Sequence, residues 1–155
     1  MKQLAIWDNP NPWHQTVDGD TDAKKIFDRH YSKYHYKDGR DPKLFVGPGE
    51  KLVLVTENYD ALFVWRKFKD DSGQKGINCS VFRNESPYLS SGLILWAEEY
   101  AWSRWPGERL YTYIAPTKIK SVNPGYCYLK AGWSKCGWTK VNKLLIMERW
   151  NRRVK

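Results

Sequence analysis

The sequence predicts a single-layer mixed domain of the α+β or α/β class, with a mainly antiparallel sheet and helices on both faces. A strand-like run at residues 77–82, apolar residues at helical spacing from Leu93 to Arg104, and a second strand-like run at 110–115 form a central βαβ unit. Other apolar runs before and after this unit add antiparallel strands. At 155 residues the chain is long enough for one hydrophobic core, so we expect a single domain over residues 1–155.

The first thirty residues predict an extended segment followed by a helix. Residues 1–19 are rich in Asn, Pro and Trp and read as a lead-in whose Trp side chains pack on the body of the domain. A helix is expected over residues 22–30, capped by Asp20 or Thr21, with its apolar side chains and His30 on one face.

The remaining strands follow from runs of apolar and β-branched residues bounded by turn residues. The first two are expected to form a hairpin, the last two to close the sheet, and residues 150–155 to form a basic tail. The expected strands are residues 52–55, 61–68, 133–139 and 141–148.

The central helix has recognisable signals at both ends. Ser90 and Ser91 stand where an N-cap is expected, and the Trp-Pro-Gly sequence at 105–107 ends the helix. The N-terminus of such a helix carries unpaired backbone N–H groups and favours an anion. Ser90, Ser91 and Gly92 are therefore candidate contacts for an anionic ligand, although capping alone would also account for the two serines.

Composition narrows the class of partner. Twenty-six Lys and Arg against 17 Asp and Glu give a formal net charge of +9, which favours a polyanion such as nucleic acid or a phosphate-rich cofactor. A generally basic protein without such a partner is the alternative. The sequence contains no membrane-span-length apolar run, and its three cysteines fit reduced thiols, so we expect a cytoplasmic protein without a membrane partner. The sequence does not indicate an oligomeric state.

Basic and aromatic residues alternate in the segment from His30 to Arg40. Cations there can meet phosphates while aromatic rings stack on bases, and a solvated loop is the alternative interpretation. The histidines lack the spacing of a zinc site, so we expect no metal. The candidate nucleic-acid contacts are Lys33, Tyr34, Tyr36, Lys37 and Arg40.

Residues 123–133, NPGYCYLKAGW, resemble the late segment of the GNAT acyltransferase superfamily, in which a short helix carrying a Tyr ends in Gly followed by an aromatic residue. The order of predicted elements is similar to that fold from about residue 20 onward. The resemblance implies that the two parallel strands, the fourth and fifth of that fold, splay apart. It also implies an acyl donor, either acetyl-CoA or another activated acyl carrier. Residues 84–92 stand in place of the family's glycine-rich phosphate loop, which leaves the donor open.

A narrower resemblance is to the Mom-type phage DNA-modification proteins. It rests on His30-Tyr31-Ser32, on Arg83 at the end of the central strand, on the serines between 86 and 91, and on Tyr128. This likeness implies transfer of an acyl-type group to an exocyclic amine of a DNA base, adenine in that branch. Such a modification would protect DNA from restriction in the host cytoplasm.

The resemblance assigns roles that rival interpretations contest. Tyr128 would be the general acid and His30 a base, with Tyr31 orienting the substrate. Both Tyr128 and His30 could instead be core residues. Tyr126 is the alternative candidate for the role of Tyr128. Arg83 would clamp a phosphate of donor or DNA, or form an ion pair with Glu85.

A flipped base would need aromatic neighbours, for which Trp65, Tyr31 and Tyr34 are candidates. The cysteines lack a partner base for a nucleophilic role. Two other functions stay open, namely an ordinary acetyl-CoA-dependent N-acetyltransferase acting on a small amine, peptide or RNA, and a non-enzymatic nucleic-acid-binding or inhibitory protein.

Overall fold

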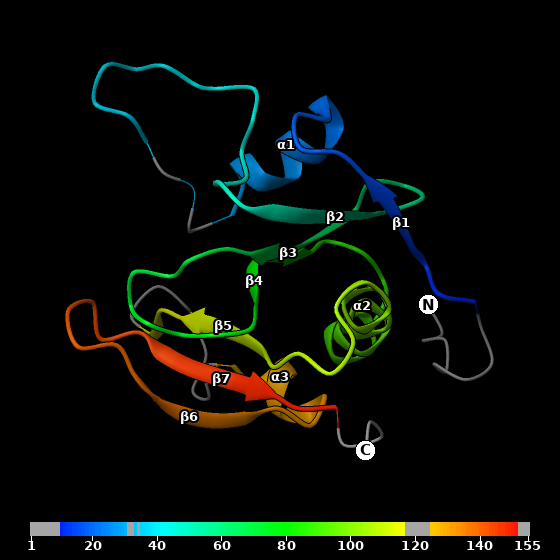
Figure 1. Cartoon of the computed structure of the whole chain (residues 1–155). Helices are drawn as coiled ribbons and strands as arrows, with labels where there is room; N and C mark the ends of the chain where they lie inside the picture. Colours follow the sequence, from blue (N-terminus) through cyan, green and yellow to red (C-terminus); the bar gives the residue numbers. More distant parts are fainter. Residues whose placement is uncertain (1–9, 31–32, 34, 117–124, 152–155) are drawn as a thin grey trace.

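The computed structural model describes residues 10–30, 33, 35–116 and 125–151. These residues form seven strands and three helices (Figure 1). The elements are β1 (Trp13–Thr16), α1 (Thr21–Asp28), β2 (Glu50–Thr56), β3 (Ala61–Lys67), β4 (Ile77–Asn84), α2 (Ser90–Arg104), β5 (Leu110–Ile114), α3 (Tyr126–Lys130), β6 (Ser134–Trp138) and β7 (Leu145–Arg149).

The strands form one open sheet in the order β1-β2-β3-β4-β5-β7-β6. The β4–β5 pair is parallel, and every other neighbouring pair in this sheet is antiparallel. A parallel pair needs a crossover connection, and α2 supplies it. The predicted mixed, mainly antiparallel sheet with a central βαβ unit is therefore confirmed.

Helices lie on both faces of the sheet because its side chains alternate between two apolar clusters. On one face, Ala23 and Ile26 of α1 pack against Val53, Leu62 and Val64. The other face carries the larger cluster, to which α2 and α3 both contribute. In Figure 1, α1 lies above β2 and α2 lies below it. The prediction of helices on both faces is confirmed.

The first helix begins as its sequence predicts. Asp20 is the N-cap, and its side chain accepts hydrogen bonds from the backbone N–H groups of Asp22 and Ala23 at 3.0 and 3.2 Å. The helix is shorter than predicted and ends at Asp28, so His30 lies beyond it, where its backbone N–H donates to the carbonyl of Phe27.

Two regions depart from the prediction. The lead-in contains strand β1, which pairs with β2, and Trp13 is buried and donates its indole N–H to the carbonyl of Leu93. The strand predicted over 141–148 begins only at Leu145, because residues 140–142 form a turn and Lys143 has a positive φ of 54°. Residues 1–9, 117–124 and 152–155, including most of the predicted basic tail, lie outside the described residues.

Candidate functional site

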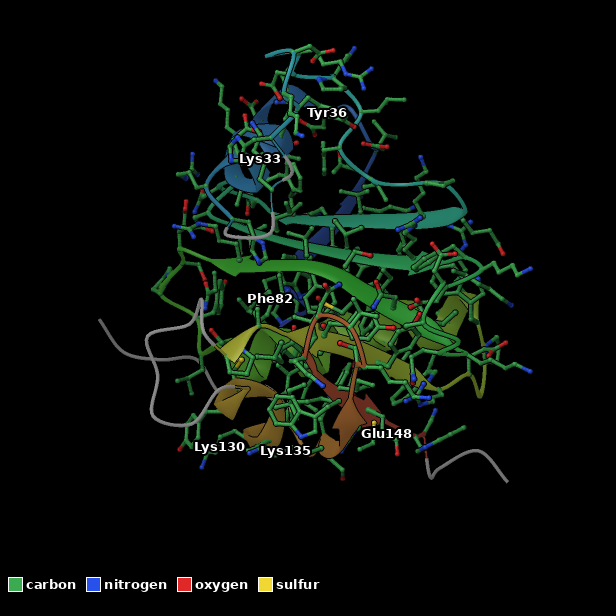
Figure 2. All side chains as sticks on the ribbon, turned by 90° about the vertical axis from the view of Figure 1, so that its left-hand side faces the viewer. Lys33, Tyr36, Phe82, Lys130, Lys135 and Glu148 are labelled. Carbon is green, nitrogen blue, oxygen red and sulfur yellow. The ribbon has the colours of Figure 1, made fainter. Side chains whose placement is uncertain are left out.

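The candidate site lies where β4 and β5 stop pairing. Their parallel ladder joins Ile77–Cys79 to Leu110–Thr112, after which β4 continues to Asn84 and β5 to Ile114. The β3–β4 ladder shifts register at the same level, because Trp65 pairs with Cys79 and Val64 with Val81. The extra residue in β4 is Ser80, so this is a β-bulge, a feature found often beside active sites. Figure 2 shows the labelled Phe82 between the ribbons of β4 and β5.

Three polar side chains meet at the end of the ladder. The hydroxyl of Tyr128 lies 3.4 Å from the sulfur of Cys79, and the hydroxyl of Thr112 donates to the carbonyl of Cys79 at 2.9 Å. Tyr128 is only 5% exposed, and its ring meets those of Phe82 and Trp133 edge-on. The predicted general acid therefore lies in the core, as its rival interpretation required, but it lies at the point where the two strands part.

Burial decides the protonation of this group. It raises the pKa of Tyr128 well above its ordinary value, and the neighbouring Cys79 and Cys127 act in the same direction. Burial likewise raises the pKa of Cys79 to about 12. Both groups are protonated at neutral pH. Tyr128 can thus donate a proton, whereas Cys79 is not a nucleophilic thiolate.

The residues on either side of α3 fix the helix that carries Tyr128. Gly125 precedes α3 with a φ of +80°, and a Cβ there would lie 2.5 Å from the sulfur of Met147. After the helix, the backbone N–H of Trp133 donates to the carbonyl of Tyr128 at 2.9 Å. Tyr126, the local competitor, is 54% exposed and points away from the core. Of the two tyrosines, Tyr128 is the one that reaches the end of the ladder.

A buried carboxyl group of α2 contacts Trp133, just after α3. Glu98 is 3% exposed, accepts a hydrogen bond from the indole N–H of Trp133 at 2.8 Å, and lies 3.4 Å from the guanidinium of Arg149. Burial raises the pKa of Glu98 to about 7, although the Trp133 hydrogen bond and the Arg149 charge act in the opposite direction. Sequence reasoning missed Glu98, because it predicted apolar contacts on the buried face of α2 and gave no reason to place a carboxyl group there.

The prediction that Ser90 and Ser91 cap the N-terminus of α2 is wrong. The N-cap is Leu89, which makes no side-chain capping hydrogen bond, so Ser90 and Ser91 lie inside the first turn rather than at the cap. Asn84 organises this segment instead, because its amide donates to the carbonyl of Tyr88 at 2.8 Å and to the hydroxyl of Ser90 at 3.0 Å. The first helical N–H groups, with Gly92 among them, carry neither a side-chain cap from Leu89 nor an acidic residue in the first turn.

Arg83 lies on the opposite face of β4 from Tyr128. Phe82 contacts the cluster that contains Tyr128, and side chains alternate along a strand, so Arg83 points toward the α1 face. Its Nε lies 2.6 Å from Glu85, which also accepts two hydrogen bonds from Arg29, both at 2.7 Å. The predicted alternative, an ion pair with Glu85, is therefore present. Hydrogen bonds from Arg29 and then Arg83 lower the pKa of Glu85 to about 2.

His30 belongs to the same group of side chains. Burial and then the positive charge of Arg83 lower its pKa to about 4, although its hydrogen bond to the carbonyl of Phe82 acts in the opposite direction. The ring is therefore neutral at physiological pH. The structure brings His30 and Arg83 together and separates both from Tyr128 by the thickness of the sheet. Tyr31 and Ser32 lie outside the described residues.

The predicted nucleic-acid loop is partly neutralised by its own acidic neighbours. The side chain of Lys33 is 14% exposed and pairs with Asp28 at 2.8 Å and with Asp41 at 3.2 Å. Arg40 pairs with Asp38 at 3.4 Å and stacks over the ring of Tyr36.

Three further predicted contacts have different outcomes. Lys37 is exposed, whereas Tyr34 lies outside the described residues. The prediction that Trp65 holds a flipped base is wrong, because Trp65 is fully buried and its indole N–H donates to the carbonyl of Ala97.

The chain matches no family model and has no significant match among curated proteins. Among the residues that the structure describes, no group of three or more His, Cys, Asp or Glu side chains could hold a metal ion. None of the helices in this described part is long and apolar enough to cross a membrane.

Proposed function

We propose that this protein is a GNAT-like acyltransferase of the Mom type, which transfers an acyl-type group to an exocyclic amine of adenine in DNA. The observation that carries the proposal is the buried hydroxyl of Tyr128 at the point where β4 and β5 part. The short helix that holds this residue is the segment on which the family resemblance rests.

Acyl transfer to an amine needs a route for the amine, donors for the developing oxyanion, and an acid for the leaving group. The amine nitrogen forms a bond to the acyl carbon and loses a proton to solvent water, while the bond from that carbon to the leaving group breaks. The phenol of Tyr128, which is protonated at neutral pH, would supply a proton to the departing atom and regain one from solvent. Backbone N–H groups of β4 beyond Cys79, on the side that β5 has left, would stabilise the oxyanion.

The two faces of β4 suggest where each substrate binds. On the α2 face, the uncapped first turn of α2 offers N–H groups to a phosphate of an activated acyl carrier, near Ser90, Ser91 and Gly92. This feature fits acetyl-CoA and equally fits another phosphate-bearing carrier. On the α1 face, two guanidinium groups share the single carboxylate of Glu85 and leave one net positive charge for a DNA phosphate.

The test is the mass of the nucleosides in cells that express the protein. DNA from expressing bacteria is digested and compared with DNA from cells that express Tyr128→Phe. Loss of a general acid typically costs about 10²–10⁴-fold in rate, so the variant should lose most of any new adenine-derived nucleoside. The mass increment would identify the transferred group. If soluble, folded wild-type protein yields no new nucleoside, the DNA-modification proposal fails.

A further inference from the structure

A second basic surface lies on the other side of the sheet from α1. We call it the hairpin surface. It is formed by α3 and by the hairpin of β6 and β7, and residues 134–147 of that hairpin contain three lysines and neither Asp nor Glu. Its exposed members are Tyr126, Lys130, Lys135, Trp138, Lys140 and Val141, together with Lys143.

Aromatic rings and ammonium groups of this surface share one side of the sheet. Lys135 pairs with Met147 and Trp138 with Leu145, and both partners contribute to the cluster beneath α2 and α3. Residues opposite each other on antiparallel strands point to the same face, so Lys135 and Trp138 point to the α3 side. Trp138 is 58% exposed there.

The short helix α3 extends the same pattern. Tyr126 and Lys130 stand one turn apart, and the Lys130 ammonium lies 5.9 Å from the centre of the Tyr126 ring. Both side chains are exposed.

The charges of the hairpin surface are not compensated by acidic neighbours. Lys24, Lys33 and Lys51 each pair with an aspartate, whereas none of the ion pairs within the described ranges involves a lysine of the hairpin surface. Nearby, Glu148 is already occupied by Arg109, at 2.6 Å. A partner for this surface must therefore bring the negative charge.

The position of the surface relates it to the candidate site. Figure 2 shows Lys130 and Lys135 at one end of the molecule and Lys33 and Tyr36 at the other, with Phe82 between them. In this view Phe82, on β4 beyond the β4–β5 ladder, thus lies between the segment of Lys33 and Tyr36 and the hairpin surface. A rod-shaped polyanion that contacts both would pass the end of that ladder.

We propose that the hairpin surface binds the phosphate backbone of duplex DNA. Uncompensated lysines that release counterions from phosphates, beside exposed aromatic rings, are the features that such a backbone requires. This inference deepens the proposed function, because it names the surface that would hold its DNA substrate. The competing interpretation is that lysines on β6 only prevent edge-to-edge pairing of sheets, since β6 is an edge strand.

The experiment measures binding alone, with no acyl donor present. Fluorescence anisotropy of a labelled duplex is recorded over a salt series for the wild-type protein and for the triple variant Lys135→Gln, Lys140→Gln, Lys143→Gln. Each lost phosphate contact should reduce the slope of log affinity against log salt by about 0.9, so the variant slope should be shallower by about 2–3. At low salt its affinity should fall by at least tenfold.

Two further variants separate the hairpin surface from general charge effects. The triple variant Lys25→Gln, Lys69→Gln, Lys75→Gln removes the same charge from exposed positions on α1 and the 69–76 loop, and it should keep a steeper slope than the hairpin variant. Trp138→Ala should weaken binding several-fold without changing the slope, because it removes no charge. Unchanged thermal unfolding of every variant shows that each one is folded.

The outcomes distinguish this inference from the proposed chemistry. Equal loss of affinity and slope in the two triple variants would overturn the hairpin assignment, as would binding of RNA alone. If the hairpin variant loses DNA binding but wild-type cells contain no new nucleoside, the hairpin assignment stands and the acyltransferase proposal falls. If wild-type cells contain a new nucleoside but the hairpin variant binds DNA normally, the acyltransferase proposal stands and the hairpin assignment falls.

Discussion

Replacing the buried carboxyl group of α2 should remove a distinct pH dependence from the stability of the protein. Glu98 lies between the indole of Trp133 and the guanidinium of Arg149, at 2.8 and 3.4 Å. Burial raises the pKa of this carboxyl group from 4.5 to about 7. The folded state therefore holds a proton on Glu98 in a pH range where the unfolded chain has released it. The amide in Glu98→Gln carries no titratable proton.

The sign and size follow from proton linkage. Between pH 4.5 and 7 the folded state binds more protons at this position, so the free energy of unfolding falls as pH rises through that range. At about 1.4 kcal/mol per pH unit, the full difference amounts to roughly 3 kcal/mol. The contribution is fully present below pH 4.5 and is lost above about pH 7.

Urea unfolding at several pH values between 4.5 and 8 measures this effect. The free energy of unfolding of Glu98→Gln, relative to the wild-type value, should improve by roughly 3 kcal/mol across the series, whatever the packing cost of the amide. Glu99→Gln is the matched control, since Glu99 is the next residue in the helix but is exposed, and it should follow the wild-type curve. Parallel curves for the wild type and Glu98→Gln would refute the assignment of a protonated carboxyl at this position.

Three other variants test the supports of the site. Asn84→Ala should cost about 1–3 kcal/mol in unfolding free energy, because it leaves the backbone carbonyl at the opening of α2 without its donor; denaturant titration measures the loss. Gly125→Ala should lower the free energy of unfolding by about 1–3 kcal/mol and lower any acyl transfer, because a Cβ at positive φ meets the sulfur of Met147. Thermal unfolding measures the loss. Gly73→Ala is the control, because a Cβ added there meets nothing. Glu85→Gln should make the free energy of unfolding depend less on pH in the acid range. The lowered pKa of Glu85 gives the wild-type protein stability that is present above pH 4.5 and lost toward pH 2. An acid titration of unfolding that is the same for both proteins would argue against the two-arginine contact.

The parts of the fold that local chemistry determines were predictable from the sequence. The hairpin of β2 and β3 follows from two apolar runs around a polar turn, and the Asp20 cap follows from an aspartate before an amphipathic helix. Strand β1 was missed because its four residues carry little pattern of their own and gain their order by pairing with β2. Short strands of this kind depend on tertiary partners.

The site was less predictable because its key contacts join distant residues. Ser90 is not a cap because its hydroxyl accepts from Asn84, and the preceding Leu89 has an extended backbone. Glu98 meets Arg149 only after α2 and β7 have packed. A sequence states which of these side chains could cap or pair, whereas the packing of elements decides which of them do.

The bulge at Ser80 explains why the predicted site residues separate into two groups. In a regular strand, residues two apart share a face, so Cys79 and Val81 would point the same way. The extra residue instead places Cys79 and Phe82 on the face of Tyr128, while Val81 and Arg83 face α1. A proton donor on one face and a cation on the other cannot act together through the closed part of the sheet. Under the proposed mechanism, the two substrates would meet beyond the point where the β4–β5 ladder ends.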